Sequence, residues 1–177
     1  MGKRIGAALL LATVLGASDG WAGSEGVGEV LAVTVPAAAL GMTALERDLP
    51  GGYQLLSSLA ATAAVTYGLN LAIDKETPDG DDGAFPSGHT SIAFAGATYL
   101  HRRYGWHYGV PAYGVAAVVG WSRIDSDHHD LTDVLGGAAL GAGVAFLLTD
   151  RLEEVSVTPL LDSRGSIAGV RVGTSWQ

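Results

Sequence analysis

The sequence predicts an all-α membrane bundle of five to six helices, followed by a short C-terminal tail for which a β-hairpin is one interpretation. Apolar residues make up 48% of the 177 residues and charged residues only 16%, whereas soluble domains usually carry about a quarter. The mean hydropathy is +0.29. There are 26 glycines without a collagen period, and small residues allow membrane helices to pack closely. A soluble all-helical protein is the alternative.

The first 22 residues have the pattern of a signal peptide. Lys3 and Arg4 precede an apolar stretch of fourteen residues, 5–18, and small residues stand at positions 20 and 22. A spanning helix needs about 20 residues, so this stretch is short. We predict cleavage after Ala22, with an uncleaved N-terminal anchor as the alternative that gives a sixth helix.

Five apolar blocks follow, and we expect each to form one helix of a domain over residues 23–150. Three reach or approach spanning length, and the two shorter blocks carry polar groups that can face the inside of a bundle. The blocks are residues 27–45, 53–73, 84–100, 107–121 and 131–149. In the tail, 151–177, apolar and polar residues alternate around 162–165, as in a small hairpin.

The positive charges predict which loops share a face. If each block crosses the membrane, eight of the ten Lys and Arg residues lie on one side. Loops that stay in the cytoplasm are enriched in these residues. Only Lys75 and Arg123 fall on the other side, in loops 74–85 and 122–130. We therefore predict a multi-pass inner-membrane protein with these two loops together on the periplasmic face.

Composition also excludes several classes of function. The chain has no cysteine, so disulfides, thiolate zinc sites and cysteine nucleophiles are ruled out. A net charge of −8 with only ten basic residues argues against nucleic acid as a partner.

The residues suited to chemistry gather at the two outer loops. Three of the five histidines, His89, His128 and His129, are found there. His129 and Asp133 are four residues apart, so a helix starting near Asp130 places them on one face. The carboxylate can then hold one ring nitrogen while the other attacks a substrate, as in a hydrolytic triad with histidine as the nucleophile.

A second group, Pro86-Ser87-Gly88-His89, stands where a helix is expected to begin. Proline is tolerated in a first turn, and the open amides with the positive helix dipole can hold an oxyanion. Arg123 can supply a planar fork for two phosphate oxygens, and His89 can protonate a leaving alkoxide. The assembly predicts phosphoryl transfer without a metal. A metal site formed by residues 125 and 127–130 is a weaker alternative, because the spacing matches no standard arrangement.

These residues resemble two of the three motifs of the type 2 phosphatidic acid phosphatase superfamily, which includes bacterial lipid phosphatases, class A acid phosphatases and vanadium haloperoxidases. The resemblance covers about residues 53–148. Its second motif is complete at 86–89, and its third at Ser122, Arg123, His129 and Asp133. The resemblance implies that His129 forms a phosphohistidine, Asp133 orients it and His89 protonates the leaving group. It also implies three phosphate ligands: Arg123, Ser87 and Gly88.

The first motif departs from the family. It should have Lys, six residues and Arg-Pro, but when Pro78 is its end, Asn70 and Thr77 occupy the two cation positions. Lys75 is a weak substitute as a phosphate ligand, because a shifted point charge does not replace an arginine fork.

The resemblance implies a metal-independent, cofactor-free phosphatase of lipid phosphates or diphosphates at the periplasmic face. Lipid A, undecaprenyl diphosphate, phosphatidylglycerol phosphate and phosphatidic acid all fit as substrates. Three alternatives stay open: a lipid phosphotransferase, a catalytically weak relative that binds lipid phosphate, and a vanadate-dependent peroxidase. The oligomeric state and the role of the tail are open as well.

Overall fold

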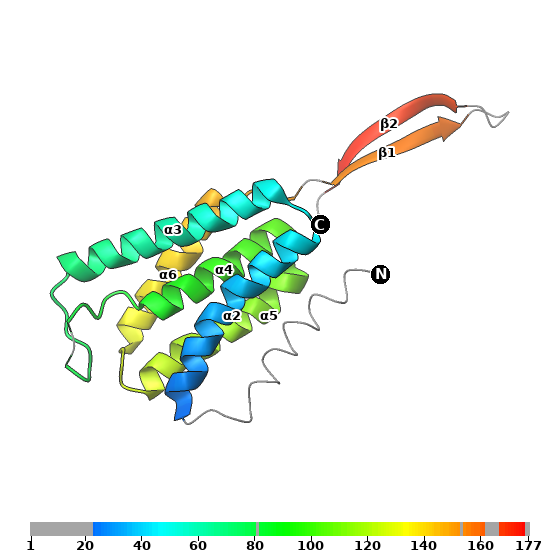
Figure 1. Cartoon of the computed structure of the whole chain (residues 1–177). Helices are drawn as coiled ribbons and strands as arrows, with labels where there is room; N and C mark the ends of the chain where they lie inside the picture. Colours follow the sequence, from blue (N-terminus) through cyan, green and yellow to red (C-terminus); the bar gives the residue numbers. More distant parts are fainter. Residues whose placement is uncertain (1–22, 81, 153, 162–166, 176–177) are drawn as a thin grey trace.

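The computed structural model describes residues 23–80, 82–152, 154–161 and 167–175, and within them the chain folds as a five-helix bundle with one pair of strands (Figure 1). The predicted signal peptide and the turn at 162–165 lie outside these residues. The elements are α2 (Gly23–Leu45), α3 (Leu49–Ala72), α4 (Gly88–Tyr104), α5 (Trp106–Asp125), α6 (Leu131–Leu148), β1 (Glu154–Leu161) and β2 (Ile167–Ser175). The predicted all-α bundle is confirmed.

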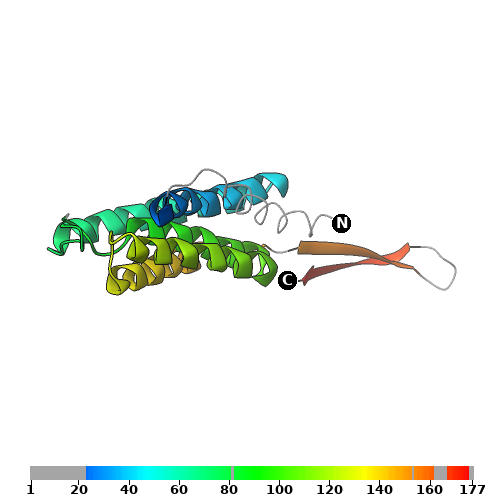
Figure 2. The same cartoon turned by 90° about the horizontal axis from the view of Figure 1, so that it is seen from below.

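Helix α4 is the centre of the bundle and packs against all four other described helices. Figures 1 and 2 show α2, α3, α5 and α6 arranged around it. Its buried face consists largely of small residues such as Ala93 and Ala97, with Tyr99 and Leu100 filling the core near its C-terminal end. After α6, β1 pairs antiparallel with β2, with Glu154 opposite Ser175.

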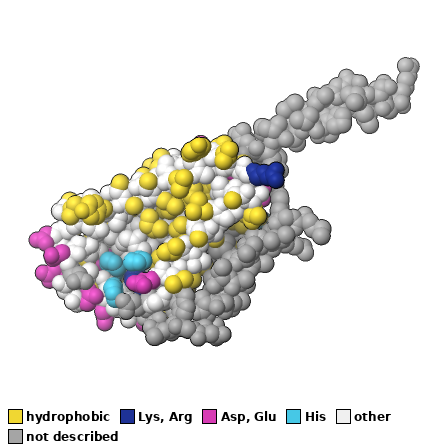
Figure 3. All heavy atoms as spheres, viewed as in Figure 1, with side chains coloured by type: hydrophobic (Ala, Val, Ile, Leu, Met, Phe, Trp, Pro, Cys, Tyr) yellow, Lys and Arg dark blue, Asp and Glu magenta, His cyan; other side chains and the backbone are white. Residues whose placement is uncertain are grey.

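Among the described residues, three helices are long and apolar enough to cross a membrane: Gly28–Leu45, Leu49–Ala72 and Leu131–Leu148. Many of their large apolar side chains point outward, among them Leu71 and Leu147. Figure 3 shows such side chains spread over the sides of the bundle. The two remaining helices, α4 and α5, correspond to the two shorter and more polar blocks of the sequence.

Helix α4 starts within the stretch 86–89, where the sequence predicts a helix start. It begins at Gly88, with Ser87 in an extended conformation as its N-cap, so the apolar block that starts at residue 84 begins before the helix does. Pro86 contributes to this boundary, because the residue before a proline is disfavoured in the helical region. The helix also continues to Tyr104, where Gly105, with a φ of 93°, ends it and starts α5.

Close backbone contact between α4 and α6 brings their N-terminal ends together. A Cβ atom on Gly141 would lie 2.0 Å from the carbonyl oxygen of Ser91, and one on Gly137 would lie 2.6 Å from that of Ser87. Any side chain at these positions would therefore force the two helices apart. The same end is joined by a hydrogen bond from the Ser87 amide to the Asp133 carbonyl, at 3.0 Å.

A buried ion pair fastens the opposite end. Arg103 donates to both carboxylate oxygens of Asp48, each at 2.6 Å, and Tyr104 donates to the same carboxylate at 3.0 Å. Burial alone would raise the pKa of Asp48, but the hydrogen bonds from Arg103 and Gly51 outweigh it and lower the pKa. The pair ties α4 to the loop between α2 and α3.

The α4–α6 contact gives a matched test of stability. We expect Gly141→Val to destabilise the bundle by roughly 1–3 kcal/mol, because the new side chain meets the α4 backbone. Gly143→Val is the control, since nothing lies within 4 Å of a Cβ atom there. Thermal unfolding in detergent measures both. Equal melting temperatures for the two variants would contradict the contact.

Candidate active site

The residues predicted to act together do meet at one end of the bundle. Ser87, Gly88 and His89 start α4, Arg123 belongs to the last turn of α5, and Asp133 lies in the first turn of α6. The short loop between α5 and α6 is closed by a hydrogen bond from the His129 amide to the Arg123 carbonyl, at 3.0 Å. Figure 3 shows histidine side chains gathered at this end of the molecule.

Asp133 is placed by the start of its own helix. Asp130 is the N-cap and accepts hydrogen bonds from the amides of Thr132 and Asp133, at 2.7 and 3.0 Å. In return, Oδ2 of Asp133 accepts from the Asp130 amide at 3.1 Å, which completes a capping box. The Asp133 side chain is 0% exposed.

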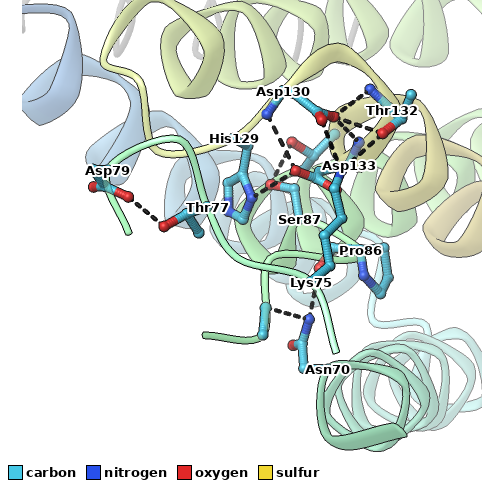
Figure 4. A network of polar contacts seen from close by, with 12 residues as sticks. Asn70, Lys75, Thr77, Asp79, Pro86, Ser87, His129, Asp130, Thr132 and Asp133 are labelled. Atoms are coloured by element: carbon cyan, nitrogen blue, oxygen red, sulfur yellow. Dashed lines mark hydrogen bonds and ion pairs between the residues drawn. The ribbon is translucent and has the colours of Figure 1, made fainter. Parts of the chain in front are cut away.

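The same oxygen faces the imidazole of His129. Nδ1 of His129 lies 3.7 Å from Oδ2 of Asp133, which is an electrostatic contact longer than a hydrogen bond (Figure 4). Nδ1 is buried and has no hydrogen-bond partner among the described residues. A small rotation of the ring would bring it within hydrogen-bond distance of the carboxylate, so the pair is arranged as the sequence predicts.

Burial controls the charge of His129. It lowers the pKa of the imidazole, and Arg123 adds to the decrease, whereas the Asp133 carboxylate opposes it by favouring the charged form. The net direction is downward from the ordinary value. His129 is therefore neutral at neutral pH, which is the form that can attack an electrophile.

Lys75 points its ammonium group at the carboxylates around His129. Its Nζ lies 2.5 Å from Oδ1 of Asp133, 2.8 Å from Oδ2 of Asp130 and 2.9 Å from Oγ1 of Thr132 (Figure 4). Burial would lower the pKa of Lys75, but the hydrogen bonds to Asp130 and Asp133 raise it above its usual value. The hydrogen bond from Lys75 also keeps the pKa of Asp130 well below its usual range. Lys75 thus holds the Asp133 carboxylate that faces His129.

Asn70 holds the loop that leads into α4. Its side-chain amide donates to the carbonyl of Gly83 at 2.7 Å and to that of Pro86 at 3.2 Å. Thr77, the other position where the family has a cation, donates to Oδ1 of Asp79. The chain carrying Thr77 and Asp79 passes beside His129 (Figure 4).

The phosphate-binding candidates on α4 and α5 are almost fully enclosed. Ser87 is buried and accepts a hydrogen bond from the hydroxyl of Thr90 at 3.0 Å, and Arg123 is 2% exposed. Helix α2 passes directly over Arg123 at Gly28, where a Cβ atom would lie 2.7 Å from the guanidinium and 1.9 Å from Oγ of Ser122. Gly28 is a site residue that the sequence motifs do not reveal.

His128, the neighbour of His129, turns toward its own loop. Its Nδ1 lies 2.9 Å from the carbonyl oxygen of Ser126 and 3.1 Å from the hydroxyl of the same residue. Within the part of the chain that the structure describes, no three His, Asp or Glu side chains are grouped as metal ligands.

An apolar cavity of about 340 Å³ adjoins the site between α2, α3 and α4. His89 and Gly88 line it together with Asn70. The remaining lining residues are Ala32, Val33, Ala63, Thr66, Tyr67 and Ile92. A long apolar group attached to a bound phosphate could lie here.

Acidic side chains surround the entrance to the site and form an acidic rim. All are exposed, and they come from the loop before α4, the last residue of α5 and the loop before α6 (Figure 3). The rim consists of Asp74, Glu76, Asp79, Asp82, Asp125 and Asp127. An anionic substrate therefore approaches against an unfavourable field.

Comparisons with known proteins agree with the two motifs. Over 117 residues, which are 59% of this chain, it is 31% identical to the lipid A 4′-phosphatase of Helicobacter pylori. Over 69 residues, which are 36% of this chain, it is 49% identical to the lipid A 1-phosphatase of Porphyromonas gingivalis. The matched regions span 59% and 15% of the length of these relatives. No solved structure matches the chain significantly.

The family assignment rests on a match to a family profile. A sequence profile of the PAP2 superfamily matches residues 60–154, more than half of the chain. This region contains α4, α5 and α6, which supply the histidines, Arg123 and Asp133. The chain belongs to the PAP2 superfamily.

Proposed function

We propose that this protein is a metal-independent phosphatase of lipid phosphates or diphosphates that works through a phosphohistidine on His129. One observation carries the proposal: His129, whose side chain is 14% exposed, faces Asp133, and its backbone is bonded to that of Arg123 at the end of the bundle where α4 begins. A nucleophile, its orienting carboxylate and an anion-binding site are thereby assembled. The relatives named as lipid A phosphatases support the same class of substrate.

The first step forms a bond between nitrogen and phosphorus. Nε2 of His129 attacks the phosphorus atom while the bond from phosphorus to the lipid oxygen breaks, and the protonated form of His89 donates a proton to that oxygen. Burial and Arg123 lower the pKa of His89, so this form is a strong acid present in a minor fraction at neutral pH. Asp133 stabilises the imidazolium that results. Arg123 and the amides at the start of α4 hold the non-bridging oxygens.

The second step returns the enzyme to its starting state. Water attacks the phosphohistidine, its proton passes to the now neutral His89, and the bond from nitrogen to phosphorus breaks. Inorganic phosphate leaves and His129 is neutral again. His89 thus serves as the acid in the first step and as the base in the second.

The cavity beside His89 supports a lipid as the substrate. Its walls are mostly apolar, and it extends between α2 and α3, both of which can span a membrane. A lipid chain in this cavity would gain about 25 cal/mol for each Å² of apolar surface removed from water. This gain helps to offset the repulsion from the acidic rim. Lipid A phosphates are the first substrates to test.

The distribution of charge favours a periplasmic site in the inner membrane. Arg47, Arg103 and Arg151 lie at the end of the bundle opposite the site, where α2, α4 and α6 end. Lys75 and Arg123 are the basic residues of the site end. Cytoplasmic loops are enriched in Lys and Arg, so the site end would face the periplasm.

A catalytically weak relative that binds lipid phosphate is the second candidate. It is supported by Asn70 and Thr77, which bring no positive charge to the positions where the family has cations. Loss of two charge-assisted contacts, each worth roughly 1.5–3 kcal/mol, would slow the reaction severely.

Phosphate release tests the hydrolase directly. The full chain in detergent, with a chelator present, should release phosphate from at least one of a panel of lipid phosphates. His129→Ala should lower the rate by at least about 10³-fold, because it removes the nucleophile. His128→Ala is the control and should leave the rate nearly unchanged. No release of phosphate from any lipid, or equal rates for wild type and His129→Ala, would contradict the proposal.

The pH dependence tests the role of Lys75. Because burial lowers the pKa of His129, kcat/KM should stay high to a lower pH than an ordinary histidine, with a pKa of about 6.5, would allow. Lys75→Met removes the cation bound to Asp133, so the carboxylate should favour the imidazolium more strongly. The pKa of His129 then rises, and the acid limb of the pH profile moves to higher pH. Lys75→Arg keeps the positive charge, so the acid limb of its pH profile should stay at the wild-type position. An identical shift of the acid limb in both variants would argue against this electrostatic role.

The two substitutions that restore the missing cations should have opposite effects on the kinetics. Asn70→Lys breaks the hydrogen bonds to Gly83 and Pro86, so we expect kcat/KM to fall. Thr77→Arg places a guanidinium on the loop beside His129, so KM should fall by about tenfold, as one added charge-assisted contact would give. Steady-state kinetics of the two single variants separate these effects. An increase in kcat/KM from Asn70→Lys would show that the hydrogen bonds from the Asn70 amide are not needed for activity.

A further inference from the structure

A second cavity lies at the end of the bundle opposite the candidate active site. Its volume is about 240 Å³, and it is lined by residues from the end of α4, the start of α5 and the end of α6. Helix α4 has 17 residues and joins the two ends, which places them about 25 Å apart. The lining residues are His101, Arg102, Gly105, Trp106, Phe146 and Arg151.

The lining is basic and aromatic, with no acidic side chain. The guanidinium of Arg102 lies over the ring of Phe146, 4.1 Å from its centroid, and the rings of His101 and Trp106 are 3.8 Å apart. These contacts hold two of the basic side chains in place. Nε of Arg102 is buried without a hydrogen-bond partner among the described residues. A buried donor is normally satisfied, so this guanidinium has hydrogen-bonding capacity that the described residues do not use.

The third basic residue, Arg151, belongs to a segment whose backbone is held by Arg103. Nη1 of Arg103 donates to the carbonyls of Asp150 and Arg151, both at 3.1 Å, and the amide of Leu152 donates back to the Arg103 carbonyl at 3.1 Å. Arg103 is itself held by Asp48. The backbone that carries Arg151 is therefore fixed before any ligand arrives, which lowers the cost of binding.

We propose that this cavity binds the phosphate group of an anionic phospholipid from the leaflet opposite the active site. Two guanidinium groups match the geometry and charge of phosphate oxygens. Trp106 is 62% exposed and Phe146 51% exposed, as expected for aromatic residues at a membrane interface. Leu147, 82% exposed, belongs to the same last turns of α6 as Phe146 and adds to the apolar surface of this end of the bundle. This site takes no part in the proposed hydrolysis.

Native mass spectrometry of the full chain in nonionic detergent tests the proposal. Wild type should retain phosphatidylglycerol in preference to phosphatidylcholine, and the double variant Arg102→Gln, Arg151→Gln should lose at least about tenfold of this retention. Arg47→Gln is the matched control, because it removes an exposed arginine at the same end but outside the cavity. His129→Ala should retain the lipid like wild type, which separates this site from the active site. The double variant Arg102→Lys, Arg151→Lys should still retain part of the phosphatidylglycerol.

A titration with inorganic phosphate distinguishes the source of the phosphate group. We expect lipid retention without measurable binding of inorganic phosphate. Binding of inorganic phosphate that depends on Arg102 and Arg151 would keep the phosphate site but overturn the lipid as its ligand. Equal retention of the two lipids, or equal loss in the double variant and in Arg47→Gln, would overturn the proposal whatever the activity of the protein.

Discussion

The buried carboxylate of Asp133 is the group on which the arrangement of the site depends. A charge in the interior is stable only when its partners surround it. Here Lys75 and the start of α6 supply these partners, and His129 faces the same group at 3.7 Å. The backbone of Asp133 also accepts the Ser87 amide, so a single residue connects the loop before α4, the N-terminus of α4 and the histidine. Loss of this carboxylate would therefore loosen the loop that carries Lys75, the first turn of α6 and the histidine, whereas the backbone bond to Ser87 would remain.

The packing of small residues makes this convergence possible. Gly137 and Gly141 let α6 lie against the backbone of α4, and Gly28 lets α2 lie over Arg123. Polar helix ends can then meet within hydrogen-bond distance although the sides of the bundle are apolar. The C-terminal end of α4 is fastened differently, by the buried ion pair of Arg103 and Asp48.

Local spacing was enough to predict the centre of the site. The interval of four between His129 and Asp133, together with a helix that starts after Asp130, placed the two side chains on one face, and the structure agrees. The family that the motifs suggested is confirmed. Contacts between distant positions could not be predicted in this way. Lys75 reaches Asp133 across 58 residues, and Arg103 is paired with Asp48 across 55. Such pairs depend on how the helices pack, and the spacing of residues within one helix does not reveal this packing.

The acidic rim has a consequence for turnover if the proposed reaction takes place. A lipid phosphate is anchored by its apolar chain, so the repulsion from Asp79 and Asp125 is only one part of its binding energy. Inorganic phosphate has no such anchor and meets the same repulsion alone. The rim would thus expel the product and hinder its return, so that the enzyme would resist product inhibition even where free phosphate accumulates.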